Sequence, residues 1–167
     1  MTTTTGTDVT TKVYQVFIKT TPEAIWEAIT NPDWTEKYGY SGRTEYSPDL
    51  RVGATFRNLA SPEFQQAGMP EVVVDGTVLE ADPPRRLVQT WRFLWSDEIK
   101  AEGPTTLTYE ISDQGNGICK LTLTHELVNA PLTTAQIGGE IEGAGGGWPY
   151  VLSDIKSLLE TGKALHV

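Results

Sequence analysis

The sequence is poor in the residues that form disulfides and metal sites. Its 167 residues include one cysteine, Cys119, and two histidines, His125 and His166. A lone cysteine excludes an internal disulfide and a thiolate metal cluster, and the two histidines stand in no metal-ligand spacing. The sequence also lacks a hydrolase motif, a phosphate-binding glycine loop and paired carboxylates at catalytic spacing. We therefore predict no metal, no cofactor and no catalytic residue.

Basic charge is scarce as well, and long hydrophobic runs are absent. Thirteen Lys and Arg against 22 Asp and Glu give a net charge of −9. Binding to a phosphate backbone needs clustered Lys and Arg, so no nucleic-acid partner is expected. No apolar run approaches the length of a membrane span, and the polar start MTTTTGTDVTT lacks the apolar core of a secretory signal. These absences predict a cytoplasmic protein with no membrane partner.

The length and composition fit a single domain. A chain of 167 residues with 38% hydrophobic content can bury a core without disulfides. We predict a flexible polar tail at residues 1–11, one domain over residues 12–163 and a short C-terminal end at residues 164–167.

Seven segments are rich in β-branched and aromatic residues, a composition that is typical of strands. They are residues 12–20, 44–48, 53–60, 71–81, 86–96, 105–112 and 117–128. Short turns join most of them, so together they predict an antiparallel meander. Gly76, inside the fourth segment, predicts a β-bulge, whereas two prolines and a glycine in residues 61–71 predict a loop.

Two short helices are predicted after the first strand, and a longer one near the C-terminus. Residues 21–30 begin with the capping pair Thr-Pro, and residues 32–38 follow an Asn-Pro pair. Residues 147–161 carry one apolar stripe at helical spacing, with Asp154 among the polar residues expected opposite it. The stripe consists of Trp148, Val151, Leu152, Ile155, Leu158 and Leu159.

Side-chain alternation gives each predicted strand one apolar and one polar face. Such a sheet must be covered on one side, and the C-terminal helix is the available cover. We predict an α+β fold in which a seven-stranded antiparallel sheet wraps around a long C-terminal helix, with two short helices after the first strand.

Four stretches of the chain resemble the AHSA-type branch of the START-like (SRPBCC) superfamily. They read TTPEAIWEAITNPD, GTVLEADPPRRLVQTWRF, LTYEI followed by CKLTLTHEL, and GGWPYVLSDIKSLLETG. The branch is named for its similarity to the C-terminal domain of Aha-type activators of a heat-shock chaperone ATPase. The resemblance implies a START-like domain over residues 12–163 with the helix-grip (birch-pollen-allergen-like) fold, which encloses a cavity between helix and sheet. The chain departs from its relatives at EKYGYSGR and in the longer segment 61–71, both near the expected mouth, so the relatives' ligand preference is not carried over.

Large aromatic side chains are expected on the inner face of this sheet and on the covering helix. Such rings form either plain core or the wall of an apolar pocket. The predicted ligand-binding residues are Phe56, Trp91, Phe93, Trp95, Tyr109, His125, Trp148 and Leu152. Gln89 and Arg57 are candidates for additional polar contacts.

His125 alternates in phase with three leucines of its strand, so it should face the apolar side. This position is compatible with a hydrogen-bonded core histidine, with a polar anchor for a ligand and with a general base. No acid or nucleophile is placed beside it by spacing, which argues against catalysis. The three glycines at residues 145–147 also allow two interpretations. They form either a loop that lets the helix dock or a hinge that binds an anion.

Three functions remain under consideration. The favoured one is a START-like domain that binds a small hydrophobic or aromatic molecule. The first alternative is a cavity enzyme of the polyketide cyclase or hydrolase type that uses His125. The second is a co-chaperone-like protein-interaction domain. A protein partner or a homodimer is therefore also considered.

Overall fold

The computed structural model describes residues 8–39, 41–142 and 145–165. The strands are β1 (Val9–Lys19), β2 (Ser41–Ser47), β3 (Thr55–Ala60), β4 (Val72–Asp82), β5 (Arg86–Phe93), β6 (Thr105–Gly115) and β7 (Ile118–Val128). The helices are α1 (Pro22–Thr30), α2 (Pro32–Thr35), α3 (Pro62–Gln66), α4 (Asp97–Ala101), α5 (Pro131–Ile137) and α6 (Gly147–Thr161).

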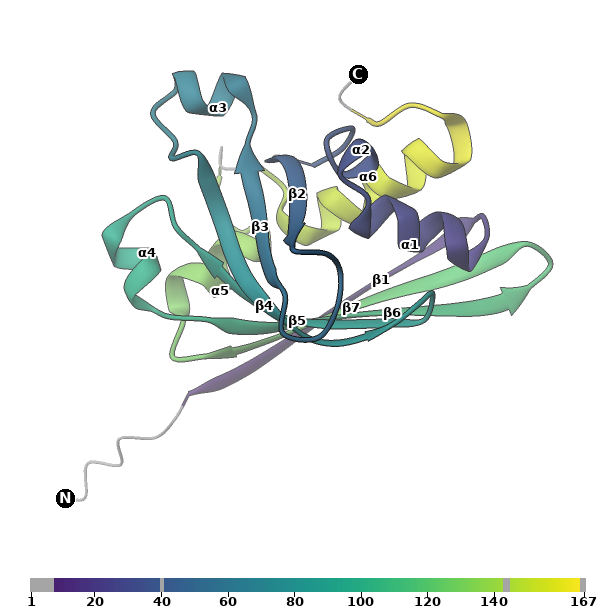
Figure 1. Cartoon of the computed structure of the whole chain (residues 1–167), viewed down its shortest axis with the longest axis horizontal. Helices are drawn as coiled ribbons and strands as arrows, with labels where there is room; N and C mark the ends of the chain where they lie inside the picture. Colours follow the sequence, from purple (N-terminus) through teal and green to yellow (C-terminus); the bar gives the residue numbers. More distant parts are fainter. Residues whose placement is uncertain (1–7, 40, 143–144, 166–167) are drawn as a thin grey trace.

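All seven strands belong to one antiparallel sheet in the order β1-β7-β6-β5-β4-β3-β2. Figure 1 shows the sheet to be strongly curved, because β2, β3 and β4 rise steeply from the other strands. The long helix α6 lies within this curve, and α1 and α2 lie beside it. The predicted fold class is therefore confirmed, including the two short helices after the first strand.

Several element boundaries differ from the prediction. Residues 9–11 were expected in the tail, but they belong to β1 and pair with β7 through Val9 and Val128. The rest of that tail up to residue 7, and residues 166–167 at the C-terminal end, lie outside the described residues. The strand predicted to end at residue 96 ends at Phe93.

Three short helices, α3, α4 and α5, were not predicted. Two of them begin with a serine cap, because Ser61 Oγ accepts a hydrogen bond from Phe64 N and Ser96 Oγ accepts one from Ile99 N, both at 3.3 Å. These caps satisfy amides that the first turn of a helix leaves unpaired. With only five residues each, α3 and α4 carry no hydrophobic periodicity, so the sequence pattern predicts a loop over residues 61–71.

Gly76 does not form the predicted β-bulge. The register of β4 against β5 shifts between Val78 and Glu80 instead. At Gly76 a Cβ atom would overlap the carbonyl oxygen of Thr90 and would also crowd Phe56. The glycine therefore permits close backbone approach where the sheet bends between β4 and β5.

Asp154 is also misplaced by the sequence pattern. It was expected on the polar side of α6, but it is fully buried. Its Oδ2 accepts a hydrogen bond from Gly39 N at 2.8 Å, and its Oδ1 accepts one from Leu165 N at 2.6 Å. The carboxylate therefore links α6 to the segment after α2 and to the C-terminal residues. Helical spacing alone cannot predict such contacts.

The glycines before α6 lie where two backbone segments cross in close contact. Gly147 has φ of +60°, and a Cβ atom there would overlap the carbonyl oxygen of Ile137. In the same crossing, a Cβ atom at Gly139 would overlap the carbonyl oxygen of Gly146. The end of α5 and the start of α6 therefore pack backbone against backbone, which supports the docking interpretation of these glycines.

We predict that Gly147→Ala lowers the free energy of unfolding by about 2–5 kcal/mol, because the new methyl group adds a clash to a left-handed backbone. The matched control is Gly162→Ala, which has φ of +83° and open space around its Cβ position. The control should lose only about 1–2 kcal/mol. Urea denaturation of both variants measures the difference, and equal losses would contradict the crossing.

We further predict that Leu152→Ala lowers the free energy of unfolding by about 2–5 kcal/mol, because its side chain is only 3% exposed in the core. Leu132→Ala is the comparison, since Leu132 is 45% exposed on α5 and should change stability by less than about 0.5 kcal/mol. If the two variants unfold at similar urea concentrations, the apolar stripe of α6 does not face the core.

Candidate ligand cavity

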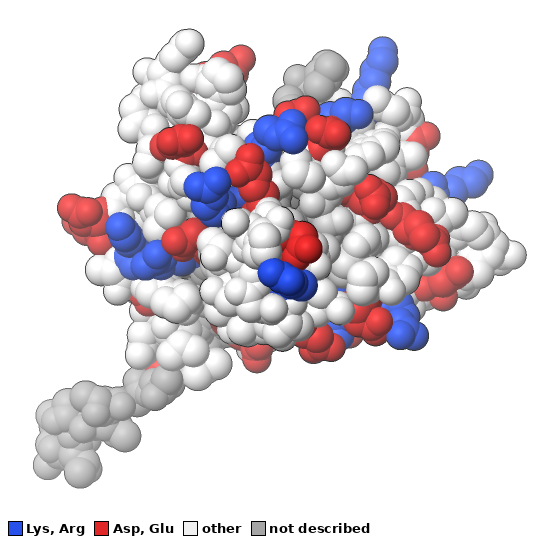
Figure 2. All heavy atoms as spheres, viewed as in Figure 1, with Lys and Arg blue, Asp and Glu red and all other residues white. Residues whose placement is uncertain are grey.

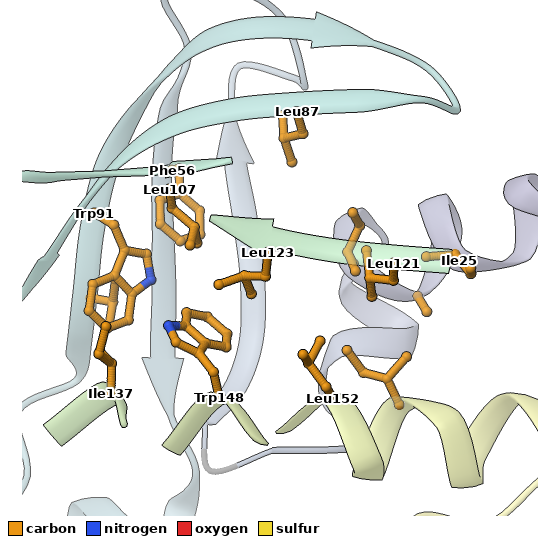
Figure 3. Close-up of a cluster of buried hydrophobic side chains, with 14 of the residues drawn as sticks. Ile25, Phe56, Leu87, Trp91, Leu107, Leu121, Leu123, Ile137, Trp148 and Leu152 are labelled. Carbon is orange, nitrogen blue, oxygen red and sulfur yellow. The ribbon is translucent and has the colours of Figure 1, made fainter. Parts of the chain in front are cut away.

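A cavity of about 590 Å³ lies between the inner face of the sheet and the helices α5 and α6. In Figure 3, Ile137 and Trp148 project from these helices toward Trp91 and Phe56 on the strands. Met69, after α3, and Gly145, before α6, are exposed members of the lining, so the cavity is not fully enclosed. Pockets of this size and apolar composition are typical of small-molecule sites.

Six of the eight predicted ligand-binding residues line this cavity. They are Phe56, Trp91, Phe93, Trp95, Tyr109 and Trp148. Alternation along β5 places Trp91 and Phe93 on one face, where their ring centroids are 4.2 Å apart in an edge-to-face arrangement. Trp148 comes from the first turn of α6, and its ring lies 5.8 Å from Trp91 and 6.4 Å from Tyr109. The aromatic wall thus combines adjacent strands with a helix.

Leu152 and Arg57 do not reach the cavity. Leu152 is buried in the core beside it, and its helical neighbours Val151 and Ile155 line the cavity instead. Arg57 points to the outer side of β3 and forms an ion pair with Glu45 at 2.9 Å. Of the two polar candidates, only Gln89 lies in the lining.

His125 is wholly buried behind the cavity wall and belongs to a chain of hydrogen bonds. The Trp148 indole N–H donates to His125 Nδ1 at 3.1 Å. Nδ1 must therefore be the unprotonated nitrogen, so the Nε2–H donates to Thr105 Oγ1 at 2.6 Å. The Thr105 hydroxyl in turn donates to the carbonyl oxygen of Trp91 at 2.7 Å.

The hydrogen-bond chain leaves His125 no free ring nitrogen for a ligand at the cavity surface. Both ring nitrogens are engaged, and the residue is not part of the lining. Burial lowers the pKa of His125 to about 3, so the imidazole is neutral near pH 7. Of the three interpretations of His125, these contacts support the hydrogen-bonded core histidine over the ligand anchor or the general base. Alternation placed the residue inward correctly, but it did not contain the two partners that occupy its nitrogens.

Tyrosine hydroxyls form a polar region of the cavity that the sequence did not indicate. The Tyr38 hydroxyl donates to the carbonyl oxygen of Ala28 at 2.7 Å, and the Tyr46 hydroxyl donates to Gln89 Oε1 at 3.5 Å. Burial raises the pKa of Tyr38, Tyr46 and Tyr109, so all three phenols stay protonated. Tyr38 and Tyr46 come from short segments without clear periodicity, and only the tertiary structure places them here.

The described lining of the cavity is uncharged. Among the described residues, the lining contains no Asp, Glu, Lys, Arg or His. Within that same part of the chain, no group of three His, Cys, Asp or Glu side chains could hold a metal ion. The described arrangement can enclose an apolar molecule and offer it hydrogen bonds.

Glu102 holds the α5 end of the cavity in place. No side chain of its own segment caps α5, so the helix takes a cap from the chain between α4 and β6. The Glu102 carboxylate accepts hydrogen bonds from Leu132 N, Thr133 N and the Thr133 hydroxyl at 2.7–2.8 Å. These bonds satisfy first-turn amides and fix the helix that carries Gln136 and Ile137 into the lining.

One face of the molecule carries charged side chains of both signs. Figure 2 shows acidic and basic side chains interspersed there, without a broad basic patch. No helix of the described residues is long and apolar enough to cross a membrane.

Comparison with known proteins identifies related sequences and folds. The family described as "Activator of Hsp90 ATPase homolog 1-like protein" matches residues 19–160. No curated protein sequence matches the chain. Many solved structures share its fold, and three of them, described next, are each 20% identical to the chain or less.

DynU16, described as a protein in the dynemicin biosynthetic locus, is 20% identical with a TM-score of 0.67, over 92% of this chain and 48% of DynU16. The Aha1 dimer from Colwellia psychrerythraea is 17% identical with a TM-score of 0.66, over 93% of this chain and 99% of that one. CalU16 from Micromonospora echinospora is 19% identical with a TM-score of 0.57, over 80% of this chain and 70% of that one. At these identities the likeness shows the fold.

The buried histidine predicts a specific dependence of stability on pH. Its pKa falls from an ordinary 6.5 to about 3 on folding, so between these values the unfolded chain binds a proton that the folded chain excludes. Stability is therefore lost as the pH falls below about 6.5, by up to about 1.4 kcal/mol per pH unit. Urea denaturation at pH 7, 6 and 5 measures this slope.

His125→Asn removes the titrating group while keeping a side-chain oxygen that can accept from Trp148. The variant should be less stable at pH 7, but its stability should fall less steeply with acid than that of the wild type. Because the other titrating groups are shared, the difference between the two slopes belongs to His125. Parallel slopes would show that His125 is not neutral and enclosed as described.

Proposed function

The chain belongs to the family of Activator of Hsp90 ATPase homolog 1-like proteins, within the SRPBCC superfamily, and we propose that it binds a small hydrophobic or aromatic molecule between α6 and the sheet. The observation that carries this proposal is the cavity of about 590 Å³ with its aromatic wall. The described residues of its lining are all uncharged. Burying an apolar molecule against such a wall is favourable by about 25 cal/mol per Å² of apolar surface removed from water.

The setting of one similar protein supports the same function. DynU16 is described as a protein of the dynemicin biosynthetic locus, which is a small-molecule context. The aligned region is about half of DynU16, so the support concerns the shared domain.

The alternative of a cavity enzyme has less support. It depended on His125, whose nitrogens are both engaged by Trp148 and Thr105. The buried phenols of Tyr38, Tyr46 and Tyr109 are poor bases because their pKa values are raised.

The alternative of a protein-interaction domain is favoured by two names. The family description refers to an Hsp90 ATPase activator, and the Colwellia protein is described as an Aha1 dimer. A homodimer or a chaperone partner is therefore the second candidate. Light scattering of the purified protein, with and without a chaperone, distinguishes it from a monomer that binds only small molecules.

Binding is tested with Nile red, a neutral fluorescent probe of apolar sites. We predict that Val151→Phe weakens Nile red binding by at least about tenfold, because the larger side chain fills part of the cavity that Val151 lines. Fluorescence titration gives the dissociation constant. Native mass spectrometry of protein purified from cells then searches for a retained molecule.

The matched control is Val52→Phe, the same substitution at a turn position that is 66% exposed and outside the lining. This variant should bind Nile red like the wild type. If both variants bind the probe with wild-type affinity, the cavity is not the binding site and the proposed function is wrong.

A further inference from the structure

Two polar side chains lie side by side on the apolar inner face of the sheet. Gln89 on β5 is only 2% exposed, and Tyr109 on β6 is half-buried. Gln89 pairs with Leu107 and Leu87 pairs with Tyr109, so the two polar residues are diagonal neighbours on one face. Both line the cavity.

Each of these side chains has a hydrogen-bonding group that no described residue engages. Gln89 Oε1 accepts from the Tyr46 hydroxyl at 3.5 Å, but Gln89 Nε2 and the Tyr109 hydroxyl have no hydrogen-bond partner among the described residues. In the same part of the chain, no wholly enclosed side-chain nitrogen or oxygen lacks a partner. The two unpartnered groups must therefore touch open space, and the open space next to Gln89 is the cavity.

The neighbouring hydroxyls determine which hydrogen-bonding role is missing. Tyr38 and Tyr46 use their protons on Ala28 O and Gln89 Oε1, so their oxygens offer only acceptance. Gln89 Nε2 and Tyr109 remain as donors. A ligand that covers these donors removes them from water, so it avoids a free-energy cost only if it brings an acceptor to this point.

Charge limits what that acceptor can be. No Lys, Arg or His occurs among the described lining residues, so a carboxylate or phosphate would be buried without a counter-charge. Such burial is strongly unfavourable, whereas a neutral carbonyl oxygen needs only the two donors.

We infer that Gln89 Nε2 and the Tyr109 hydroxyl together bind the carbonyl-type oxygen of an uncharged hydrophobic ligand, whose apolar body lies against the wall formed by Trp91, Phe93 and Trp148. This inference rests on the proposed function and names the chemical class of its ligand. It also moves the polar anchor from His125 to the two strands β5 and β6.

Three naphthalenes that differ in one substituent test this inference: 2-acetylnaphthalene, 2-ethylnaphthalene and 2-naphthoate. Isothermal titration calorimetry gives their affinities for the wild type and for Gln89→Leu. We expect Gln89→Leu to weaken the ketone about three- to tenfold, the usual effect of one lost hydrogen bond, and to leave the ethyl compound unchanged or tighter. The naphthoate should bind the wild type most weakly of the three.

Tyr109→Phe is the second variant, and it should reduce the ketone-to-ethyl affinity ratio in the same direction while keeping the ring. Gln15→Leu is the matched control, because Gln15 is exposed on the outer face of β1. The control should leave the ratio unchanged.

The outcomes separate this inference from the proposed function. If the probes bind but neither Gln89→Leu nor Tyr109→Phe changes the ratio, the anchor is wrong and the binding function stands. Tightest binding by the naphthoate would overturn the uncharged class alone. If none of the three probes binds, the proposed function falls together with the inference.

Discussion

The hydrogen-bond chain from Trp148 through His125 and Thr105 to the Trp91 carbonyl is the interaction on which the site depends. It joins the first turn of α6 to β7, β6 and β5 in succession. Because every member is buried, each lost bond would leave a polar group without water to replace its partner. The hydrogen-bond chain thereby fixes Trp148 against Trp91, and both rings line the cavity.

Backbone contacts hold the same end of the helix from the other side. Gly139 and Gly147 let α5 and α6 cross without side chains between them, and Glu102 caps α5 from the preceding loop. Further along α6, Asp154 holds Gly39 and Leu165. The cavity therefore lies beneath a helix whose start and middle are both positioned by specific polar or steric contacts, a form of preorganisation that lowers the cost of binding.

The chemistry of the described cavity lining supports the proposed binding of a neutral ligand. Its described lining is uncharged, its phenols are held neutral by burial, and the neighbouring imidazole of His125 is held in a single neutral tautomer. In the proposed function, the donors at Gln89 and Tyr109 distinguish among neutral ligands by their acceptors. Membership of the family is compatible with both a ligand-binding and a partner-binding role, and the cavity favours the former.

The sequence by itself determined the strands, the covering helix and most of the aromatic wall, because alternation and helical spacing are local properties that reveal which side of an element is buried. It placed Gln89, Trp91 and Trp148 inward correctly. Only the tertiary structure decided what those side chains meet. Helical spacing assigned Asp154 to solvent, although residues distant in sequence enclose it. Alternation made His125 the most plausible anchor, although Trp148 and Thr105 take both its nitrogens. Hydrogen-bond partners far apart in the chain leave no trace in the period of either segment, so these assignments required the folded molecule.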